Sequence, residues 1–393
     1  MKIGLVTPYV YPLPGGVNDH VGHLYEALRA RGHDVRILSA SHGFQRSSEG
    51  DVIRIGKGFS VPSNGSMGTI TISPRYRSQI QAVLDREQFD LLHFHEPFVP
   101  LLALVTLRES RSVNIATFHA YAGYAPGYQL GGKLLGPVAR NLHGRIAVSA
   151  AARHFADRYL PGDYKVIPNG VDLRRFAHAV PLARWQDGTP NILFVGRLEP
   201  RKGLLPLLKA YRILRKSGCA CRLLVVGSGP QEREARRYVM TRRLPDVEFL
   251  GRVSDGDKVQ LFKTADVYAS PATGRESFGI VLLEAMAAGT AIVCSDIHGY
   301  KGVVKRGEQA LLVPPGESRP LAEAILRLLA DPALRERMGQ SGLERVVDYG
   351  WEQIGARVEA YYGFVIRRLA AQGALPRDFH SEIPPDPRGS PPA

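Results

Sequence analysis

Cysteine, long apolar runs and a glycine-rich dinucleotide fingerprint are scarce or absent in this sequence of 393 residues. The three cysteines, Cys219, Cys221 and Cys294, are an odd number without CxxC spacing, which argues against a disulfide framework and a zinc site. A reducing cytoplasm is therefore the expected compartment. The stretch Met1–Val6 is too short for a signal-peptide core, and no run approaches the roughly 20 apolar residues of a membrane span. We expect a protein that is neither exported nor integral to a membrane.

Negative charge is also in short supply. Lys and Arg number 51 against 37 Asp and Glu, which gives a formal net charge of +14. Such an excess indicates an anionic partner or surface, for which a nucleotide sugar, an anionic lipid and a nucleic acid are candidates. Nucleic acid is the least favoured of the three, because the basic residues are not interleaved with aromatic residues as in a recognisable reader. Length and a 44% hydrophobic content favour two domains of ordinary size.

Short β-branched runs alternate with longer helical patterns, as in α/β proteins with buried parallel strands. The expected strands of the first half are Ile3–Val6, Val35–Leu38, Leu91–Phe94, Asn114–Phe118 and Arg145–Val148. Those of the second half are Ile192–Val195, Leu223–Val226, Val247–Leu250, Val267–Ala269 and Ala291–Cys294. Its expected helices lie near Leu204–Lys216, Asp257–Ala265, Ile280–Ala288 and Pro320–Leu329. Two such series predict two Rossmann-like domains whose parallel sheets face each other across a cleft.

The turn-rich stretch 172–190 separates the two series. We expect one domain over residues 1–175, a second over 186–350, and a helix over 351–372 that packs back on the first. Residues 373–393 are rich in proline and charge and are expected to be a disordered tail. Ligands of such folds bind at the carboxyl ends of strands, so the loops that follow strands are the places to search.

The loop after the first strand contains Gly15 and Gly16 just before a helix. Paired glycines let the backbone approach a ligand, and the helix N-terminus offers N–H groups to a phosphate. An ordinary tight turn has the same pattern. The loop lacks GxGxxG, which lowers the case for a nicotinamide cofactor.

The loop after the first strand of the second half, GRLEPRKG, carries Arg197, Arg201 and Lys202. Three cations within six residues repel one another unless an anion lies between them. A diphosphate would fit, because Arg197 can bind two oxygens at once and Lys202 acts as a point charge. A solvated basic loop is the alternative.

Glu276 and Glu284 lie eight positions apart in the segment ESFGIVLLEAMAAG. Glu284 interrupts an apolar run that is expected to be buried, and a buried carboxylate needs hydrogen-bond donors such as sugar hydroxyls. The N–H groups from Phe278 to Val281 open a helix and can face a phosphate or sugar oxygen. The alternative is a pair of ordinary structural glutamates.

Seven motifs, in order from Lys2 to about Tyr361, together resemble the family-4 retaining glycosyltransferases of the glycosyltransferase B fold. They are GGVNDHV, ATFH, AVS, PNGVD, GRLEPRKG, FLGRV and ESFGIVLLEAMAAGTAIV. The bacterial phosphatidylinositol mannosyltransferases are the most similar in pattern. The resemblance implies a hexosyltransferase with the acceptor on the N-terminal domain and the nucleotide-sugar donor on the C-terminal one. The enzyme would act at the cytoplasmic face of the plasma membrane as a peripheral protein.

The resemblance also implies roles for individual donor-side residues. Arg197 and Lys202 would hold the diphosphate together with the Gly16 amide from the opposite domain, and Glu284 would bind the ribose. Glu276 would bind the sugar hydroxyls. The backbone groups expected beside it are those of Phe278, Gly279, Ile280 and Val281. The base would lie near Val253, and Asp255 would favour guanine, hence GDP-mannose over a UDP-sugar.

Asp255-Gly256-Asp257 also spells a DxD, which binds divalent metal in another glycosyltransferase fold. Three-residue patterns recur by chance, and the helix beginning here needs a capping region. We expect no cofactor and no essential metal.

The resemblance places His119, at the end of an expected strand, near the transferred sugar, where it would hydrogen bond to the sugar or acceptor and stabilise the transition state by position and polarity. A purely structural histidine at a strand end is the alternative. With Glu276, Arg197 and Lys202, His119 completes the expected catalytic set. The resemblance implies same-face attack without a covalent nucleophile. The residues expected on the acceptor side are Tyr9, Asn18, Asn64, Thr69 and His119.

The acceptor side departs from the phosphatidylinositol enzymes at two positions. Thr69 stands where they have an arginine suited to a lipid phosphate, and Phe98 stands where they have an asparagine. A UDP-sugar transferase acting on diacylglycerol or another glycolipid is therefore a rival. Arg75, Arg77 and Arg86 lie on a probable helix that could rest on anionic lipid or be an ordinary helix with a solvated basic face. A sugar-nucleotide epimerase and a non-enzymatic binding module remain further alternatives.

Overall fold

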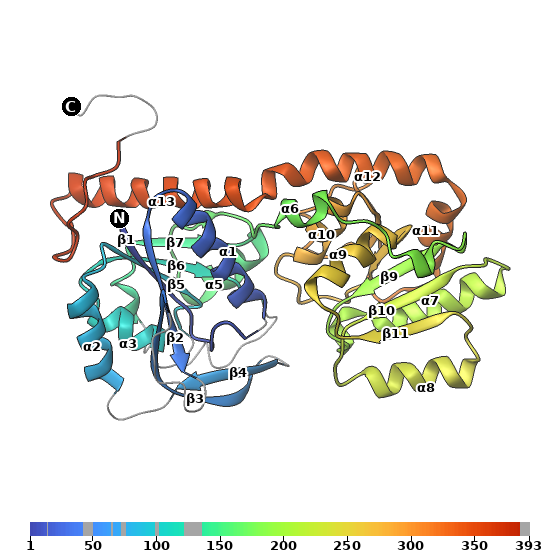
Figure 1. Ribbon diagram of the computed structural model, residues 1–393, viewed down its shortest axis with the longest axis horizontal. Coiled ribbons are helices and arrows are strands. Elements are labelled where there is room, and N and C mark those ends of the chain that lie inside the picture. Colours follow the sequence, from blue (N-terminus) through green and yellow to red (C-terminus); the bar gives the residue numbers. More distant parts are fainter. Residues whose placement is uncertain are drawn as a thin grey trace. The chain divides into compact units, whose positions relative to one another are not determined.

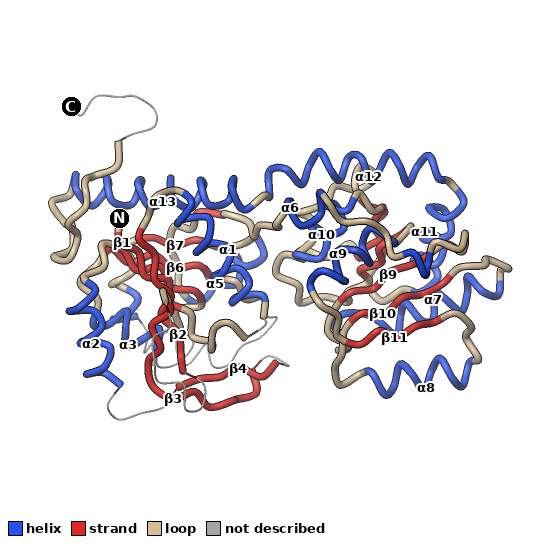
Figure 2. Tube along the Cα trace, in the orientation of Figure 1, coloured by secondary structure: helices blue, strands red, loops and turns tan. Residues whose placement is uncertain are grey.

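The computed structural model describes residues 1–13, 15–41, 50–63, 66–71, 76–98, 102–121 and 136–385, with only the backbone described at 57–63 and 66–71. The chain forms two compact units. Unit 1 comprises residues 1–169 and 351–393, and unit 2 comprises residues 170–350. Each unit is a parallel sheet with helices on its faces (Figures 1 and 2), so the expected pair of Rossmann-like domains is confirmed. Every helix in the described ranges is too short or too polar to cross a lipid bilayer.

Unit 1 has an eight-stranded sheet in the order β4-β3-β2-β1-β5-β6-β7-β8, parallel except for the β3–β4 hairpin. Its strands are β1 (Lys2–Val6), β2 (Asp34–Ser41), β3 (Val52–Ser63), β4 (Ser66–Thr71), β5 (Leu91–His95), β6 (Val113–Phe118), β7 (Gly144–Ala147) and β8 (Lys165–Val166). All five expected strands are present. The hairpin was not expected, because Ser and Gly residues interrupt its β-branched residues, which include Val52, Ile53 and Ile55.

The helices of unit 1 are α1 (Gly16–Ala30), α2 (Tyr76–Glu87), α3 (Leu102–Glu109), α5 (Ala150–Tyr159) and α13 (Trp351–Ala371). Helix α13 buries a stripe at helical spacing, with Ile354, Val358, Tyr362 and Ile366 in the same core as Leu24 of α1. The helix expected over 351–372 therefore has its core partners in unit 1.

The segment after α13 differs from the expected disordered tail. The backbone N–H of Asp378 donates to the Arg111 carbonyl at 3.0 Å, and those of His380 and Ser381 donate to the Asp90 carboxylate at 2.8 and 2.9 Å. Asp90 is buried, and a buried carboxylate needs donors wherever the chain can supply them. Composition could not reveal this acceptor, so residues 374–385 are ordered against unit 1, while 386–393 lie outside the described residues.

Unit 2 has a six-stranded, all-parallel sheet in the order β11-β10-β9-β12-β13-β14. Its strands are β9 (Asn191–Val195), β10 (Arg222–Val226), β11 (Val247–Gly251), β12 (Val267–Ser270), β13 (Ala291–Ser295) and β14 (Ala310–Val313). Its helices are α6 (Leu173–Ala177), α7 (Leu204–Lys216), α8 (Glu232–Arg242), α9 (Asp255–Thr264), α10 (Ile280–Ala288), α11 (Ser318–Ala330) and α12 (Pro332–Val346), with short 3₁₀ turns η1 (Ala183–Trp185), η2 (Pro200–Lys202) and η3 (Val347–Tyr349).

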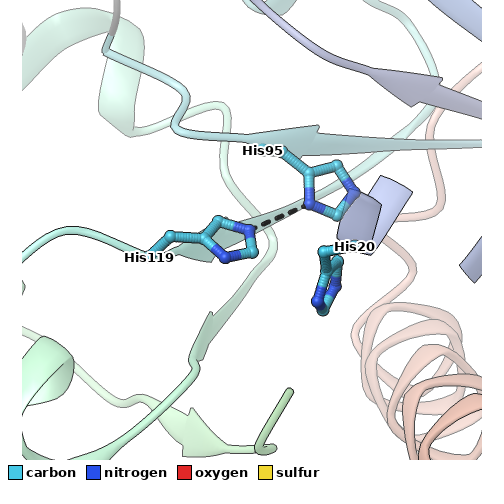
Figure 3. Close-up of side chains that lie close together, drawn as sticks. All are labelled: His20, His95 and His119. Carbon is cyan, nitrogen blue, oxygen red and sulfur yellow. Dashed lines mark hydrogen bonds between the residues drawn. The ribbon is translucent and has the colours of Figure 1, made fainter. Parts of the chain in front are cut away.

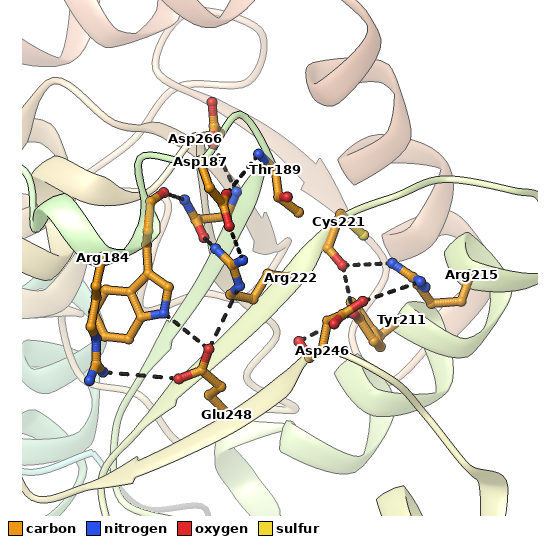
Figure 4. Close-up of polar contacts among 12 residues, drawn as sticks. Arg184, Asp187, Thr189, Tyr211, Arg215, Cys221, Arg222, Asp246, Glu248 and Asp266 are labelled. Atoms are coloured by element: carbon orange, nitrogen blue, oxygen red, sulfur yellow. Dashed lines mark hydrogen bonds and ion pairs between the residues drawn. The ribbon is translucent and has the colours of Figure 1, made fainter.

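The amino ends of β9, β10 and β11 are joined by a polar network (Figure 4). Arg222 lies between Asp187 and Glu248, with N···O distances of 2.6 and 3.7 Å, and Trp185 Nε1 donates to Glu248 at 3.0 Å. The Arg222 guanidinium also donates to the Asn191 side chain. This network stabilises the sheet at the amino ends of its strands. The carboxyl ends of the strands remain available for ligand binding.

Candidate active site

Two cations and one carboxylate meet at the carboxyl edge of the unit 2 sheet. Lys202 Nζ lies 2.7 Å from Glu276 Oε1, and Arg201 Nη1 lies 2.6 Å from the same oxygen. Arg201 also contacts Glu199 at 2.6 Å. Glu276 is only 7% exposed, so its charge depends on these partners. Lys202 was expected to bind the diphosphate and Glu276 the sugar of one donor, and these roles remain predictions. Their direct ion pair, and the part that Arg201 takes in it, were not expected from the sequence.

The η2 turn is locked against the loop that leads to Glu276. The Thr273 N–H donates to the Arg201 carbonyl at 2.8 Å. Gly203, at φ +77°, lies so close to this loop that a Cβ would come within 1.9 Å of the Pro271 carbonyl oxygen. Only glycine fits such an approach in this backbone conformation. The glycine after RK thus fixes where Arg201 and Lys202 point.

Arg197 lies at the end of β9 and is exposed. The neighbouring Leu198 N–H donates to the Ser228 carbonyl at 3.1 Å, which holds this loop against the one after β10. The expected role of Arg197 in holding a diphosphate remains a prediction.

Glu284, inside α10, is paired with Lys258 of α9. Lys258 Nζ lies 2.7 Å from Glu284 Oε1 and 3.5 Å from Asp255 Oδ1. Burial raises the pKa of Glu284, and the charge of Lys258 opposes that rise. Asp255 is largely exposed and also lies 3.4 Å from Arg175. Lys258 was missed, although its place three residues after Asp255 on a helix puts both on one face.

The first turn of α10 presents the backbone groups that were expected to face the donor. Gly279 caps the helix at φ +90°, and an added Cβ would come within 2.6 Å of the buried Tyr300 ring. Phe278 is buried, while Ile280 and Val281 are half-buried. Early N–H groups of a helix have no intrahelical acceptor, so they can bind an anionic or hydroxyl oxygen beside Glu276.

The Asp-Gly-Asp sequence forms the start of α9. Ser254 is the N-cap: its Oγ accepts from the Asp257 N–H at 3.0 Å and donates to the Asp257 carboxylate at 2.7 Å. This reciprocal pairing satisfies the helix end. Asp257 is thus committed to the capping that the sequence led us to expect. Val253, the expected neighbour of the base, lies just before the cap and is half-buried.

In unit 1, a buried glutamate positions the backbone of His119. Glu96 follows β5 with φ +53°, and its Oε1 accepts the N–H groups of His119 and Ala120, both at 2.7 Å. The His119 Nε2 lies 3.2 Å from His95 Nδ1, and the His20 ring lies beside both (Figure 3). Of these residues only His119 was predicted from the sequence. His20 stands inside the motif GGVNDHV and Glu96 inside none of the seven motifs, and nothing in their spacing shows that they lie near His119.

The histidines of this cluster are neutral. Burial lowers the pKa of His20 to about 4, against the opposing hydrogen bond to Asn169. Burial, followed by the neighbouring imidazoles, lowers the pKa values of His95 and His119 well below the ordinary value. His119 therefore offers one N–H and one lone pair at physiological pH rather than a positive charge.

The β1–α1 loop is held by Asn18, whose side chain is buried. Its amide donates to the carbonyls of Val10 and Leu13, both at 2.8 Å, and accepts from the Thr7 hydroxyl at 2.9 Å. These contacts shape the loop instead of leaving the amide for an acceptor. Tyr9 is partly exposed, and burial followed by the charge of Glu96 raises its pKa. Gly16 is the exposed first residue of α1.

The remaining acceptor-side predictions fall mostly outside the description. Asn64 and Arg75 lie outside the described residues, and Thr69 is described only as a backbone partner of Ser60 in the β3–β4 hairpin. The ring centroids of Phe98 and Phe118 lie 6.0 Å apart.

Helix α2 resembles an ordinary Rossmann helix more than a lipid-resting one. Its apolar residues are buried in the unit, namely Tyr76, Ile80, Val83 and Leu84. Arg77 pairs with Glu109 at 2.9 Å, and Arg86 pairs with Glu87 at 2.8 Å. The apolar face is therefore unavailable to a bilayer, and any lipid contact by this helix would be electrostatic only.

Comparison with known proteins agrees with this arrangement. The family described as "Glycosyltransferase Family 4" matches residues 14–175, and "Glycosyl transferases group 1" matches residues 183–345. The phosphatidyl-myo-inositol mannosyltransferase of Mycobacterium leprae is 38% identical over 92% of this chain and 96% of its own. That of Mycolicibacterium smegmatis is 36% identical over 96% and 98%.

Solved structures share the fold. Sucrose-phosphate synthase from Thermosynechococcus elongatus is 25% identical, with a TM-score of 0.73 over 94% of this chain and 99% of its own. HepE from Anabaena, solved in complex with UDP-glucose, is 19% identical, with a TM-score of 0.74 over 93% and 100%. The glycosyltransferase B fold expected from the motifs is therefore confirmed. Given relatives of this identity over more than nine-tenths of its length, the chain belongs to the family-4 glycosyltransferases.

Proposed function

We propose that the protein is a retaining α-mannosyltransferase that transfers mannose from GDP-mannose to a membrane lipid, with phosphatidyl-myo-inositol as the first acceptor to test. The main support for the proposed donor is the Arg201–Lys202–Glu276 cluster, which lies at the carboxyl ends of the unit 2 strands. It combines cations suited to a diphosphate with a carboxylate suited to sugar hydroxyls.

Each part of the donor, from the hexose to the base, has a proposed partner in unit 2. Lys202 and Arg197 bind the diphosphate, and Glu276 with the first turn of α10 binds the hexose. Glu284, held by Lys258, accepts from the ribose hydroxyls. Asp255 accepts from guanine, for which its largely exposed carboxylate supplies the acceptors that uracil cannot use in the same pattern. Since side-chain cations and helix N–H groups supply the positive charge, turnover needs no metal ion.

Unit 1 supplies the neutral groups of the reaction. The acceptor hydroxyl attacks the anomeric carbon on the face from which the phosphate leaves, and the departing phosphate oxygen takes the hydroxyl proton. His119, neutral and oriented by Glu96, hydrogen bonds to the sugar as positive charge develops on the ring. The net charge of +14 favours residence at an anionic membrane surface on the cytoplasmic side.

The test is a donor-by-acceptor matrix. Purified protein is incubated with radiolabelled GDP-mannose or UDP-glucose and with vesicles that contain phosphatidylinositol, diacylglycerol or neither, and lipid-soluble label is counted. The proposal expects label only with GDP-mannose and phosphatidylinositol. Label from UDP-glucose in diacylglycerol supports the rival suggested by Thr69 and Phe98. Conversion of the sugar on the nucleotide without acceptor identifies an epimerase, and binding without any turnover identifies a binding module.

A further inference from the structure

Three imidazoles from three separate elements meet in unit 1. His20 comes from α1, His95 ends β5, and His119 follows β6. One ring nitrogen from each lies within 4.8 Å of the other two (Figure 3). His20 and His95 are buried, and His119 is partly exposed, which leaves the cluster accessible from one side.

The geometry of one pair already matches a metal site. His95 Nδ1 and His119 Nε2 are 3.2 Å apart, and two nitrogens bound tetrahedrally to Zn²⁺ at about 2.0 Å are separated by about 3.3 Å. His20 offers the third ring nitrogen, within 4.8 Å of the other two.

Asn169 prepares His20 as a ligand. Its Oδ1 lies 2.9 Å from His20 Nδ1, which places the ring proton on Nδ1 and the lone pair on Nε2. Metal-bound histidines are usually oriented by such an outer hydrogen bond. The His20 ring is also held edge-on by Trp351, at 5.0 Å between centroids. A free side chain would not be fixed in this way.

His95 carries an unsatisfied nitrogen. Its Nε2 is buried and has no hydrogen-bond partner in the described part of the chain, and such a group costs free energy until it finds one. Because His95 would bind the ion through Nδ1, the nitrogen that faces His119, its Nε2 would carry the ring proton and is not itself a ligand. The Glu96 carboxylate beside His119 offsets part of the charge that a cation would bring.

We propose that His20, His95 and His119 bind one divalent transition-metal ion, Zn²⁺ in the first instance, with the fourth position open to water. Imidazole ligands select Zn²⁺ or Co²⁺ over Mg²⁺ and Ca²⁺. Binding itself does not depend on the proposed function. Its consequence does: a metal on His119 removes that imidazole from the sugar, so the occupied site inhibits transfer.

The test uses full-length protein freed of metal by a chelator and titrated with Co²⁺ in the absence of substrates. The wild type is expected to bind one Co²⁺ per chain with the intense visible absorption of four-coordinate cobalt, displaced by Zn²⁺. His20→Ala and His95→Ala each lose at least about 10-fold in affinity through the lost ligand. The matched control His154→Ala removes an exposed histidine of α5 and leaves the titration unchanged.

Asn169→Ala keeps all three ligands and is expected to weaken binding about 10- to 100-fold. This variant, with the wild-type titration, keeps the proposal testable if a histidine variant fails to fold. Two results overturn it: a wild-type titration without a four-coordinate spectrum, or equal loss in His20→Ala and His154→Ala. Because no donor or acceptor is present, neither result bears on the glycosyltransferase assay.

Discussion

The two units use opposite electrostatics at their candidate sites. Unit 2 gathers charge: Arg201 and Lys202 share the carboxylate of Glu276, and Lys258 holds that of Glu284. Unit 1 gathers neutral imidazoles, whose pKa values burial has lowered. A charged cluster suits a diphosphate, and a neutral one suits hydroxyl groups at a carbon where positive charge develops. The difference fits the proposal that unit 2 holds the donor through charged groups while unit 1 supplies neutral groups to the reaction.

The largest expected effect comes from removing the charge at the centre of the unit 2 site. Glu276→Gln keeps the shape of the side chain but weakens its hold on the sugar hydroxyls and on Lys202. We expect kcat/KM to fall by about 100- to 1,000-fold, as for loss of one preorganised group. Glu248→Gln, at the opposite edge of the same sheet, is the matched control and should stay within about twofold. Equal loss in both would mean that unit 2 only needs its fold intact.

A smaller effect is expected for the cation beside it. Lys202→Met removes one charge that would contact the diphosphate, which corresponds to about 10- to 100-fold weaker GDP binding by calorimetry. Lys209→Met, on the exposed face of α7, is the control. Salt should weaken wild-type binding more than that of Lys202→Met, because fewer charges remain to be screened. Unchanged affinity in Lys202→Met would contradict the assignment of charge to unit 2.

In unit 1, the hydrogen bonds from Glu96 that fix the backbone of His119 can be removed without changing the imidazole. Glu96→Ala removes the acceptor of two N–H groups, and we expect kcat to fall about 10-fold with GDP binding unchanged. Glu96→Gln retains an acceptor oxygen and should recover most of the loss. If GDP affinity falls in step with kcat, the effect is not confined to positioning in unit 1.

The neutral state of the histidines has a consequence for the pH dependence of turnover. Since the pKa of His119 is lowered, the residue gains a proton only at pH values below the usual histidine range. We therefore expect kcat/KM to show no histidine ionisation between about pH 5 and 8. An ionisation near the ordinary histidine pKa that disappears in His119→Asn would show that unit 1 works with a charged imidazole.

The smallest effect concerns stability at the amino edge of the unit 2 sheet. The Arg222 hydrogen bond lowers the pKa of Asp187 to about 2. A carboxyl group with a depressed folded-state pKa contributes stability above its unfolded pKa and loses it as pH falls through the folded value. Urea unfolding should therefore separate the wild type from Asp187→Asn above about pH 4 and bring them together near pH 2. In an Arg222→Met background the separation should shrink to the part that the Thr189 hydrogen bond supplies.

Much of the fold follows from local sequence. The β-branched runs predict the strands because a parallel strand buried on both faces must be apolar throughout. That Lys202 and Glu276 would lie near each other was likewise predictable, since both follow strands of the same sheet and the carboxyl ends of parallel strands lie side by side. Their direct ion pair was not predicted. The motif order was enough to identify the family.

Tertiary structure decided which side chains complete each site. Arg201 reaches Glu276 because Gly203 fixes the turn against Pro271, a contact between residues far apart in sequence. The meeting of His20 with His119 depends on how α1 and β6 pack around β5. Asp90 orders the segment after α13 for the same reason: a buried polar group takes whichever partner the fold brings within reach, and sequence distance carries no record of that choice.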